Sequence, residues 1–426
     1  MQKAIRPAKA IQGAVRLPGD KSISHRYAIL AGLAEGASHL HNFSTGADCH
    51  STLNAVRALG IHVEENGTDV TIHGQGLHGW KSPGQDLDAG NSGSTIRMMS
   101  GALAAQPFTS RIGGDESLSR RPMDRVMQPL TQMGGRITAR GGRFPPLIIE
   151  GTGLRAIDYT LPVPSAQVKT CILFAGMYAD GPTIVRESIR SRDHTEIALR
   201  EFGADIALRR GVITLHGPAV LTGRELMVPA DLSSAAFFIV AALLVPGSQL
   251  LIQGVGLNPT RSTLLDFLIS AGAQIRVLHL EQVNGELVGN IQISYSPIRG
   301  GVIEKSTTAA LIDEIPVLAV LGAASEEGLV IRDARELRIK ETDRIATVAD
   351  NFARMGIRVE QTPDGMTIPG RQKFRAARFD SFGDHRIGMA FAVAALLGDG
   401  ESIVDNAEAA SVSFPEFYNI LDEVAV

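Results

Sequence analysis

Apolar and polar positions along this chain of 426 residues repeat one pattern six times. Each copy is a helix-like run rich in Ala, Leu and Gly, then a tight turn, then a short β-type run. The turn residues are Gly36, Pro107, Gly181, Gly247, Gly328 and Gly400. A helix that is hydrophobic on every side belongs in a protein interior. The pattern therefore predicts six buried helices at nearly even spacing.

A second pattern alternates with the first: an amphipathic helix that ends at glycine, followed by a strand. The closing glycines are Gly60, Gly134, Gly203, Gly272 and Gly356. Glycine just beyond a helix end adopts the left-handed conformation that terminates the helix. The sixth unit has no clear copy of this second pattern. Together the patterns predict six βαβαββ units, and because six are too many for one core, we expect two lobes of three units each.

Lysine and arginine recur at predicted helix beginnings, where the helix dipole disfavours positive charge by about 0.3–1 kcal/mol. The cations in such positions are Lys21, Arg26, Arg97, Arg120, Arg121, Arg125, Lys169, Arg190, Arg192, Lys340, Arg344 and Arg386. A single one would be an ordinary surface cation. Many cations at helix N-termini, each unfavourable by itself, indicate a function that offsets their electrostatic cost. Since helix N-termini and arginine both bind anions, the set predicts a cleft for small polyanionic molecules.

The N-terminal caps of these helices are predicted from their hydroxyl and carboxylate residues. In "LPGDKSISHR" we expect Ser22 or Ser24 to cap the first helix. The caps expected for four later helices are Ser94, Ser165, Thr342 and Asp384, and Pro122 is expected as the first residue of a fifth helix.

Composition narrows the classes of partner. The net charge of −4 argues against binding nucleic acid or a membrane surface, and five Tyr and one Trp offer little for base stacking. The longest apolar run, Ala235 to Val245, is shorter than the roughly 18 residues of a membrane span. The N-terminus shows no signal-peptide pattern. Cys49 and Cys171 lack motif spacing, so we expect free thiols in a reducing cytoplasm.

No motif for a cofactor or metal is found. "GDKS" lacks the first glycine of a phosphate-binding P-loop. The group His39, His41, Cys49 and His50 has the spacing of no known metal site. We therefore predict a protein without cofactor or metal.

Two carboxylates stand among the cations. Glu341 lies between Lys340 and Arg344, and on a helix both Lys340 and Glu341 would share a face with Arg344. Asp313 precedes an apolar run in "ALIDEIPVLAVLGA". There it is either a helix cap or a group that moves protons in the cleft, and its spacing leaves both readings open.

Eight segments, in order, resemble the 5-enolpyruvylshikimate-3-phosphate synthase family. They are "LPGDKSISHR", "GNSGSTIR", "DESLSRRPMDRV", "SAQVK", "SRDHTE", "LIDEIPVLA", "ELRIKETDR" and "DHRIGMAFA". The resemblance implies a two-lobed, inside-out α/β barrel of six βαβαββ repeats, three per lobe. One lobe would span residues 17–227, the second residues 1–16 and 228–426, with the active site in the cleft between them.

The resemblance also implies a reaction. The enolpyruvyl group of phosphoenolpyruvate would pass to the 5-hydroxyl of shikimate 3-phosphate, with release of phosphate, through a tetrahedral intermediate. This transferase reaction belongs to the shikimate pathway, which makes chorismate and the aromatic amino acids. A cytoplasmic monomer without cofactor, metal, nucleic-acid or membrane partner would be expected.

Residue roles follow from the same resemblance. Shikimate 3-phosphate would be held by Lys21, Ser22, Arg26, Ser165, Gln167, Arg192, Asp313 and Lys340. Phosphoenolpyruvate would be held by Lys21, Gly93, Arg121, Gln167, Arg344 and Arg386. Asp313 would take the hydroxyl proton, Glu341 would protonate the methylene carbon, and Lys21 would assist. Because position 93 is glycine, the inhibitor glyphosate is expected to fit.

Two other functions stay open on the sequence. UDP-N-acetylglucosamine enolpyruvyl transferase shares the implied fold but usually carries a reactive cysteine in the loop that here reads "GGDESLSRRPM"; both cysteines lie elsewhere. A non-catalytic binder of phosphate ligands would not need both Asp313 and Glu341. A phosphate-release assay separates a binder from an enzyme.

Overall fold

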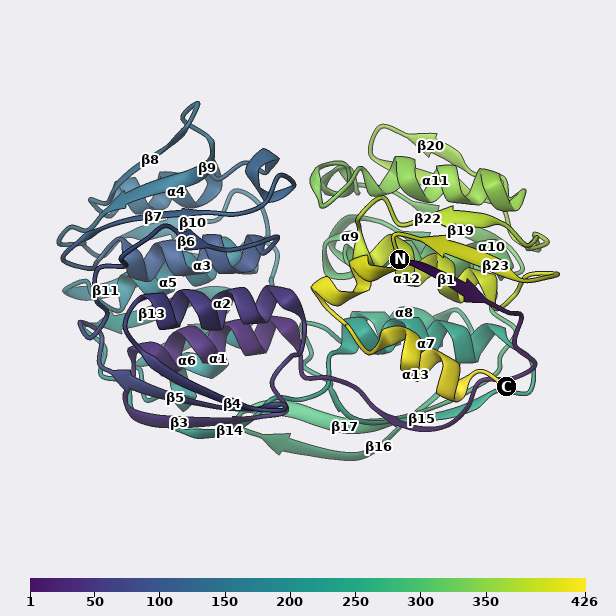
Figure 1. The fold of residues 1–426 in the computed structure, drawn as a ribbon, viewed down its shortest axis with the longest axis horizontal. Helices are drawn as coiled ribbons and strands as arrows, with labels where there is room; N and C mark the ends of the chain where they lie inside the picture. The colour runs from purple at the N-terminus through teal and green to yellow at the C-terminus, as the bar shows by residue number, and fades with distance from the viewer. The chain divides into compact units, whose positions relative to one another are not determined.

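Two separate apolar cores divide the chain of the computed structural model, which describes residues 1–426. Unit 1 consists of Met1–Pro18, Pro229–Gln282 and Leu287–Val426. Unit 2 consists of Gly19–Val228 and Val283–Glu286. The chain therefore begins in unit 1, builds nearly all of unit 2, and then completes unit 1 (Figure 1).

Unit 2 has three four-stranded sheets. Their strand orders are β14(Glu225–Met227)-β3(Glu35–His41)-β5(Asp69–Gln75)-β4(His62–Asn66), β6(Leu87–Asp88)-β7(Thr109–Gly113)-β9(Phe144–Glu150)-β8(Arg136–Arg140) and β10(Asp158–Thr160)-β11(Gly181–Arg186)-β13(Val212–Gly217)-β12(Ile206–Arg209). In each sheet the first pair is parallel and the other pairs are antiparallel. The helices are α1(Lys21–Leu33), α2(Ala47–Ala58), α3(Gly93–Leu103), η1(Leu118–Arg120), α4(Asp124–Gln132), α5(Ala166–Gly176) and α6(His194–Glu201).

Unit 1 has two four-stranded sheets and one of three strands. Their orders are β16(Gln274–Val283)-β17(Glu286–Ser294)-β15(Gln249–Gly256)-β2(Gln12–Arg16), β18(Gly300–Ile303)-β19(Gly328–Ile331)-β21(Gly365–Ile368)-β20(Glu360–Thr362) and β1(Gln2–Ile5)-β23(Ser402–Asp405)-β22(Arg378–Asp380). The helices are α7(Leu232–Leu244), α8(Thr263–Ser270), α9(Lys305–Leu311), α10(Ile315–Ala324), η2(Arg335–Ile339), α11(Arg344–Met355), α12(His385–Ala395), η3(Ala407–Val412) and α13(Phe417–Val424).

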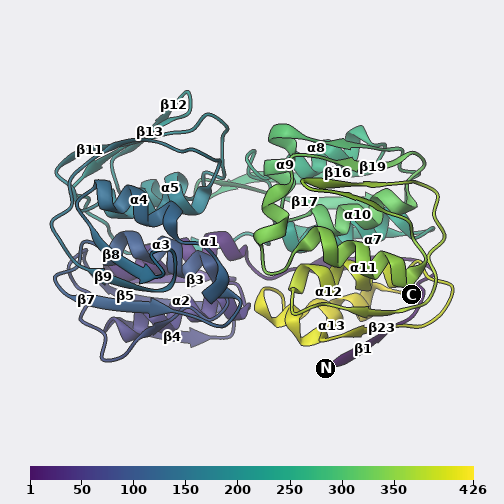
Figure 2. The same ribbon diagram turned by 90° about the horizontal axis from the view of Figure 1, so that it is seen from above.

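The six apolar runs form the central helices, as predicted: α1, α3 and α5 in unit 2, and α7, α10 and α12 in unit 1. Every residue of α7 from Leu232 to Leu243 is buried, and so is every residue of α12. Within each unit, the two ribbon views show these helices inside and the strands outside (Figures 1 and 2). The predicted inside-out α/β architecture is confirmed, because helices without a polar face must be covered on all sides.

The five closing glycines have the left-handed backbone that the second pattern predicts. Their φ angles are +86° at Gly60, +98° at Gly134, +101° at Gly203, +105° at Gly272 and +77° at Gly356. The sixth sheet has only three strands, and its edge strand is β1, from the N-terminus, antiparallel to β23. The absence of a second pattern in the sixth unit thus corresponds to a shorter sheet completed by the other end of the chain.

Several predicted helix beginnings are wrong by one to four residues. Asp20, not Ser22 or Ser24, caps α1, and Asp343, not Thr342, caps α11. An ionised carboxylate accepts the orphan N–H groups of a helix more strongly than a hydroxyl does, which explains these two.

The beginnings of α3 and α4 also differ from prediction. Ser92 caps α3, and the hydroxyl of the predicted cap Ser94 instead accepts a hydrogen bond from Gln167. Helix α4 begins at Asp124 rather than Pro122, and the Met123 amide before it donates to the carbonyl of Arg143. Ser165 and Asp384 cap α5 and α12 as predicted.

No single helix has the length and apolar character needed to cross a membrane. Helices α9 and α10 reach that length only as a pair, and they are bent by 111° where they join.

Candidate active site

The N-terminal turns of α3 and α5 are joined by side chains in unit 2. Gln167 Nε2 donates to Ser94 Oγ over 3.0 Å, and Arg97 Nη1 donates to Gln167 Oε1 over 2.8 Å. A Cβ atom added at Gly93 would lie 2.8 Å from Arg97 Nη1 and 3.5 Å from Arg121 Nη1. Two guanidinium groups therefore lie against the first residue of α3, which suits an anion at this helix N-terminus.

Lys21, the first residue of α1, is held by a buried carboxylate. Its Nζ donates to Asp48 Oδ2 over 3.0 Å, and Asp48 lies in the first turn of α2. Sequence reasoning missed Asp48, because an acid in the first turn of a helix is ordinary. The pair keeps the ammonium at the N-terminus of α1 rather than in bulk solvent.

Arg26 is buried in the second turn of α1, and its donors bind protein oxygens. Nε donates to Thr195 Oγ1 over 2.7 Å, Nη1 to the Ser22 carbonyl over 2.7 Å and Nη2 to Thr170 Oγ1 over 3.0 Å. Burial lowers the pKa of Arg26 to about 10, and nearby Arg192 lowers it further while carboxylates oppose the shift. Arg26 is therefore still a cation at neutral pH, and it ties α1 to the beginnings of α5 and α6.

Lys169 was predicted as one of the anion-binding cations at helix N-termini, but its side chain is not available to a ligand. It is fully buried in α5, with Nζ 3.0 Å from Glu187 Oε2 and 2.8 Å from Glu196 Oε1. Burial raises the pKa of Glu196, and Lys169 opposes that shift. The expectation fails because Lys169 lies on a helix that is covered on all sides. Glu187 also accepts from Ser191, so this ion pair supports the loop that carries Arg190 and Arg192.

Asp313 lies in the turn between α9 and α10 of unit 1. Lys340 Nζ donates to Asp313 Oδ1 over 3.3 Å, and Arg386 Nη1 donates to the Asp313 carbonyl over 2.8 Å. The residue that directly precedes α10 is Glu314, so the reading of Asp313 as a helix cap is wrong. Its carboxylate faces the ammonium of Lys340 and the guanidinium of Arg344 instead.

Arg344, the first residue of α11, is 1% exposed and lies among three carboxylates. Nη2 donates to Glu341 Oε2 over 2.6 Å and Nε to Asp384 Oδ2 over 2.8 Å, while Nη1 lies 3.8 Å from Asp313 Oδ1 and makes no hydrogen bond. Burial opposes the charge, but Asp384, Glu341 and Asp313 together raise the pKa of Arg344.

Lys340 and Glu341 are not helical, which corrects the shared helix face predicted for them. They precede α11, whose cap is Asp343. Asp343 Oδ2 also accepts from Arg338 Nη1 over 2.7 Å, and this contact fixes the bend before the helix. Glu341 reaches Arg344 across that bend.

The predicted site residues thus form two groups, one in each unit. Unit 2 carries Lys21, Ser22, Arg26, Gly93, Arg121, Ser165, Gln167 and Arg192. Unit 1 carries Asp313, Lys340, Glu341, Arg344 and Arg386. Arg120 joins neither group, because it is exposed and paired with Glu116. Cations at helix N-termini can bind carboxylates and phosphates, and the unit 1 group adds two carboxylates that can exchange protons.

Three further side chains support these groups and were not predicted as site residues. Arg97 binds Gln167, Asn91 accepts from Arg121 over 2.8 Å, and Asp384 holds Arg344. Arg97 and Asp384 were recognisable as a cation and a cap at helix beginnings. Asn91 carries no such signal.

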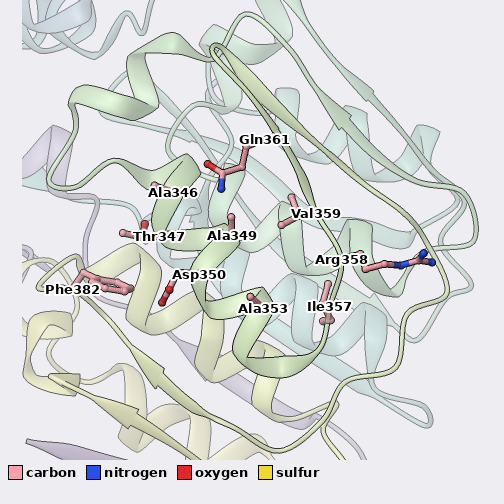
Figure 3. Close-up of a pocket in the computed structure, with 10 residues that line it drawn as sticks. All are labelled: Ala346, Thr347, Ala349, Asp350, Ala353, Ile357, Arg358, Val359, Gln361 and Phe382. Atoms are coloured by element: carbon pink, nitrogen blue, oxygen red, sulfur yellow. The ribbon is translucent and has the colours of Figure 1, made fainter.

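An open groove of about 850 Å³ lies along α11 and β20 of unit 1 (Figure 3). Ala346, Ala349, Ala353 and Ile357 line it, and Arg358 extends away from the other labelled side chains. A mainly apolar lining does not suit a doubly charged ligand. We therefore place the candidate active site at the two charged groups and not in this groove.

Comparison with known proteins finds close similarity over the whole chain. A sequence profile of the family "EPSP synthase (3-phosphoshikimate 1-carboxyvinyltransferase)" matches residues 5–421. The chain is 68% identical over 425 residues to the 3-phosphoshikimate 1-carboxyvinyltransferase of Solibacter usitatus, with 100% of both chains covered. It is 51% identical over 421 residues to that of Koribacter versatilis, covering 99% of this chain and 98% of the relative.

A solved structure is similar as well. EPSP synthase from Acinetobacter baumannii superposes with a TM-score of 0.88 at 40% sequence identity, covering 100% of this chain and 98% of that one.

Proposed function

The chain belongs to the EPSP synthase (3-phosphoshikimate 1-carboxyvinyltransferase) family, and from that membership we propose which of its side chains bind substrate and which move protons. It is a transferase of the shikimate pathway, which leads to the aromatic amino acids. It transfers the enolpyruvyl group of phosphoenolpyruvate to the 5-hydroxyl of shikimate 3-phosphate and releases phosphate. Both substrates carry a carboxylate and a phosphate, which accounts for cations gathered at helix N-termini.

Asp313 and Glu341 lie on two sides of one buried guanidinium, that of Arg344, and the proposal rests chiefly on this observation. Arg344 Nη1 is 3.8 Å from Asp313 Oδ1, and Nη2 is 2.6 Å from Glu341 Oε2. An acid and a base placed around one anion-binding group can act on a substrate held there. A protein that only binds phosphate ligands would not need this arrangement.

Phosphoenolpyruvate is bound by Arg344 and Arg386 of unit 1 and by Lys21, Gly93, Arg121 and Gln167 of unit 2. Shikimate 3-phosphate is bound by Asp313 and Lys340 of unit 1 and by Lys21, Ser22, Arg26, Ser165, Gln167 and Arg192 of unit 2. Arg344 supports this assignment because its Nη1 is buried without a hydrogen-bond acceptor, a state that a bound anion would relieve.

Proton transfer follows in two stages. Asp313 accepts the 5-hydroxyl proton as that oxygen attacks C2 of phosphoenolpyruvate, while Glu341 delivers a proton to C3. The product is a tetrahedral adduct that still carries phosphate. Glu341 then removes a proton from the C3 methyl group as the C–O bond to phosphate breaks, and the double bond forms again. Lys21 stabilises the negative charge of the leaving phosphate. The proton that Asp313 accepted passes to this phosphate, which restores the Asp313 carboxylate.

Substrate binding at Arg344 prepares Glu341 to act as an acid. Without substrate, the pair with Arg344 keeps the Glu341 carboxylate ionised. An anionic substrate that binds Nη1 of the same guanidinium, which has no hydrogen-bond acceptor, brings a new negative charge close to Glu341. A nearby like charge favours the protonated form of a carboxylate.

The enzyme works as a monomer in the reducing cytoplasm, without nucleic-acid or membrane partners. Two features support this part of the proposal. Cys49 and Cys171 are buried free thiols, and the net charge of −4 offers no basic excess.

The test is phosphate release from phosphoenolpyruvate in the presence of shikimate 3-phosphate. Asp313→Asn keeps the shape of the side chain but removes the base, so kcat should fall by about 10²-fold or more. Asp350→Asn is the matched control, since Asp350 lies in the same unit and pairs with Arg354 over 2.8 Å. Unchanged kcat in Asp313→Asn would contradict the assigned role, and Lys21→Ala checks the unit 2 group in the same assay.

A further inference from the structure

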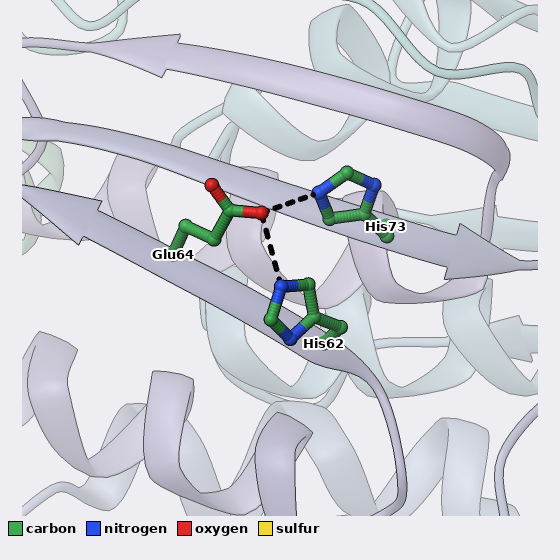
Figure 4. A group of neighbouring side chains, drawn as sticks. All are labelled: His62, Glu64 and His73. Atoms are coloured by element: carbon green, nitrogen blue, oxygen red, sulfur yellow. Dashed lines mark hydrogen bonds and ion pairs between the residues drawn. The ribbon is translucent and has the colours of Figure 1, made fainter.

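Three side chains able to bind a metal converge on the outer face of the sheet β14-β3-β5-β4, and the proposed function uses none of them. His62 and His73 are direct partners on the antiparallel strands β4 and β5. Glu64, two residues after His62, projects from the same face of β4. Their neighbours Val63 and Ile72 are buried on the opposite face. The strand register therefore places two imidazoles and a carboxylate together in solvent (Figure 4).

Both imidazoles direct the same ring atom to one carboxylate oxygen. His62 Nε2 lies 3.0 Å and His73 Nε2 lies 3.1 Å from Glu64 Oε1. All three ligand atoms lie within 4.8 Å of one another. Ligands bound tetrahedrally to zinc at about 2.0–2.1 Å stand about 3.3 Å apart. Two of the three separations are already close to those of a zinc site.

The remaining adjustment is small, because the side chains are exposed. The exposed fractions are 68% for His62, 60% for Glu64 and 44% for His73, so small side-chain rotations can close the third separation. A neutral imidazole that binds a metal through Nε2 carries its proton on Nδ1, so Nε2 of both histidines is the atom that can serve as ligand here.

Another histidine on the same face, His41, shows which arrangement of ligands a metal ion requires. His41 also has two acidic neighbours, but Asp69 lies 3.1 Å from its Nδ1 and Glu225 lies 3.2 Å from its Nε2. These nitrogens face opposite sides of the ring, so both carboxylates and the imidazole cannot bind a single ion. Both clusters therefore place histidine next to acidic side chains. Only at His62, Glu64 and His73 do the ligand atoms point toward one common position.

We propose that His62, Glu64 and His73 bind one divalent transition-metal ion of the zinc type, with water completing its coordination. Imidazole and carboxylate are ligands that Zn²⁺ accepts, and three protein ligands leave a position for water. Strand β4 is the edge of its sheet and pairs only with β5. An ion that bridges the two strands ties down this edge and stabilises the folded chain.

The experiment titrates Zn²⁺ into the untagged full-length chain by calorimetry and follows thermal unfolding with and without the ion. The wild type should bind one ion per chain and unfold at a higher temperature when Zn²⁺ is present. The double variant His62→Asn, His73→Asn should bind at least about tenfold more weakly and lose the thermal shift. Circular dichroism of the metal-free double variant checks that it is folded, which its exposed positions favour.

His41→Asn is the matched control, because it removes an exposed histidine of the same sheet face outside the converging group. It should retain both the affinity and the thermal shift of the wild type. Equal Zn²⁺ affinity in the wild type and the double variant would overturn the proposal. So would loss of binding in His41→Asn while the double variant still binds.

Discussion

Single residues at the beginnings of the buried helices set the space and the charge beside each helix N-terminus. Gly93 is the clearest example, since the guanidinium groups of Arg97 and Arg121 lie against its Cα. Glycine is needed there to leave room for these guanidinium groups. Its backbone conformation is not the reason, because its φ lies outside the left-handed region.

Gly93→Ala should raise KM for phosphoenolpyruvate several-fold and weaken glyphosate inhibition, with a smaller effect on kcat. A Cβ 2.8 Å from Arg97 Nη1 forces that guanidinium to move and narrows the space beside the helix N-terminus. Steady-state kinetics with and without glyphosate measures both effects. Gly84→Ala is the control, because a Cβ there meets nothing within 4 Å. A variant with wild-type KM and inhibition would contradict the role given to Gly93.

His25 should make stability depend on pH. Burial, assisted by Lys21 and Arg26, lowers the pKa of His25 well below its ordinary value of 6.5. Below pH 6.5, His25 is therefore protonated in the unfolded chain but stays neutral in the folded chain. The contribution of His25 is present above that pH and is lost as pH falls, by up to about 1.4 kcal/mol per pH unit.

Denaturant unfolding between pH 7.5 and 5 measures this slope. His25→Gln should flatten it, since glutamine does not titrate, whereas His216→Gln, at an exposed position, should keep it. An unchanged slope in His25→Gln would assign the pH dependence to other groups.

At the scale of a single element, the N-terminal cap of α1 supports the candidate site. Asp20 Oδ1 accepts from the Ile23 amide over 2.9 Å, and Lys21 follows it directly. The side chains His25, Thr52, Thr95 and Ser92 then form a hydrogen-bonded chain from α1 through α2 to the cap of α3. The first turns of three helices are thus held in register with one another.

Asp20→Ala should reduce the free energy of unfolding by about 1 kcal/mol and raise KM for both substrates. The reason is that the first turn of α1 frays and Lys21 loses its fixed position. Asp20→Asn retains a side-chain acceptor and should lose much less stability. Urea unfolding and steady-state kinetics report the two effects. Equal losses in both variants would indicate that the negative charge, not the cap, matters.

At the scale of the whole molecule, each unit completes a sheet with a strand from a distant part of the chain. Strand β2, which precedes unit 2 in the chain, lies parallel to β15 of unit 1, and β14, at the end of unit 2, lies parallel to β3 at its beginning. Each unit therefore completes its sheets from its own residues, while its helices and strands come from distant parts of the sequence.

The fragment of residues 19–228 should fold cooperatively but release no phosphate. It contains all sheets of unit 2 and nearly all of that unit's core. It lacks Asp313, Glu341 and Arg344. It also lacks Glu286, whose Oε1 is 2.6 Å from buried His194 Nδ1, so reduced stability is expected. Circular dichroism and the phosphate assay check this, and an unfolded fragment would show that the core of unit 2 is insufficient.

The sequence alone determined the repeated architecture and predicted most residues of the candidate site. Six apolar runs and five closing glycines are local signals, because solvent exposure and backbone conformation act on each helix separately. The motifs around Lys21, Gly93 and Arg344 identified the family for the same reason, since each motif is contiguous in the chain.

Only the tertiary structure decided which polar groups meet. Lys169 was grouped with the site cations, yet it lies between Glu187 and Glu196 in the core, because the burial of a helix face depends on its neighbours. Packing brings Asp313, in the turn between α9 and α10, close to Arg344 of α11. Strand register brings His62 of β4 opposite His73 of β5. Such contacts join residues far apart in the chain, and no local pattern records them.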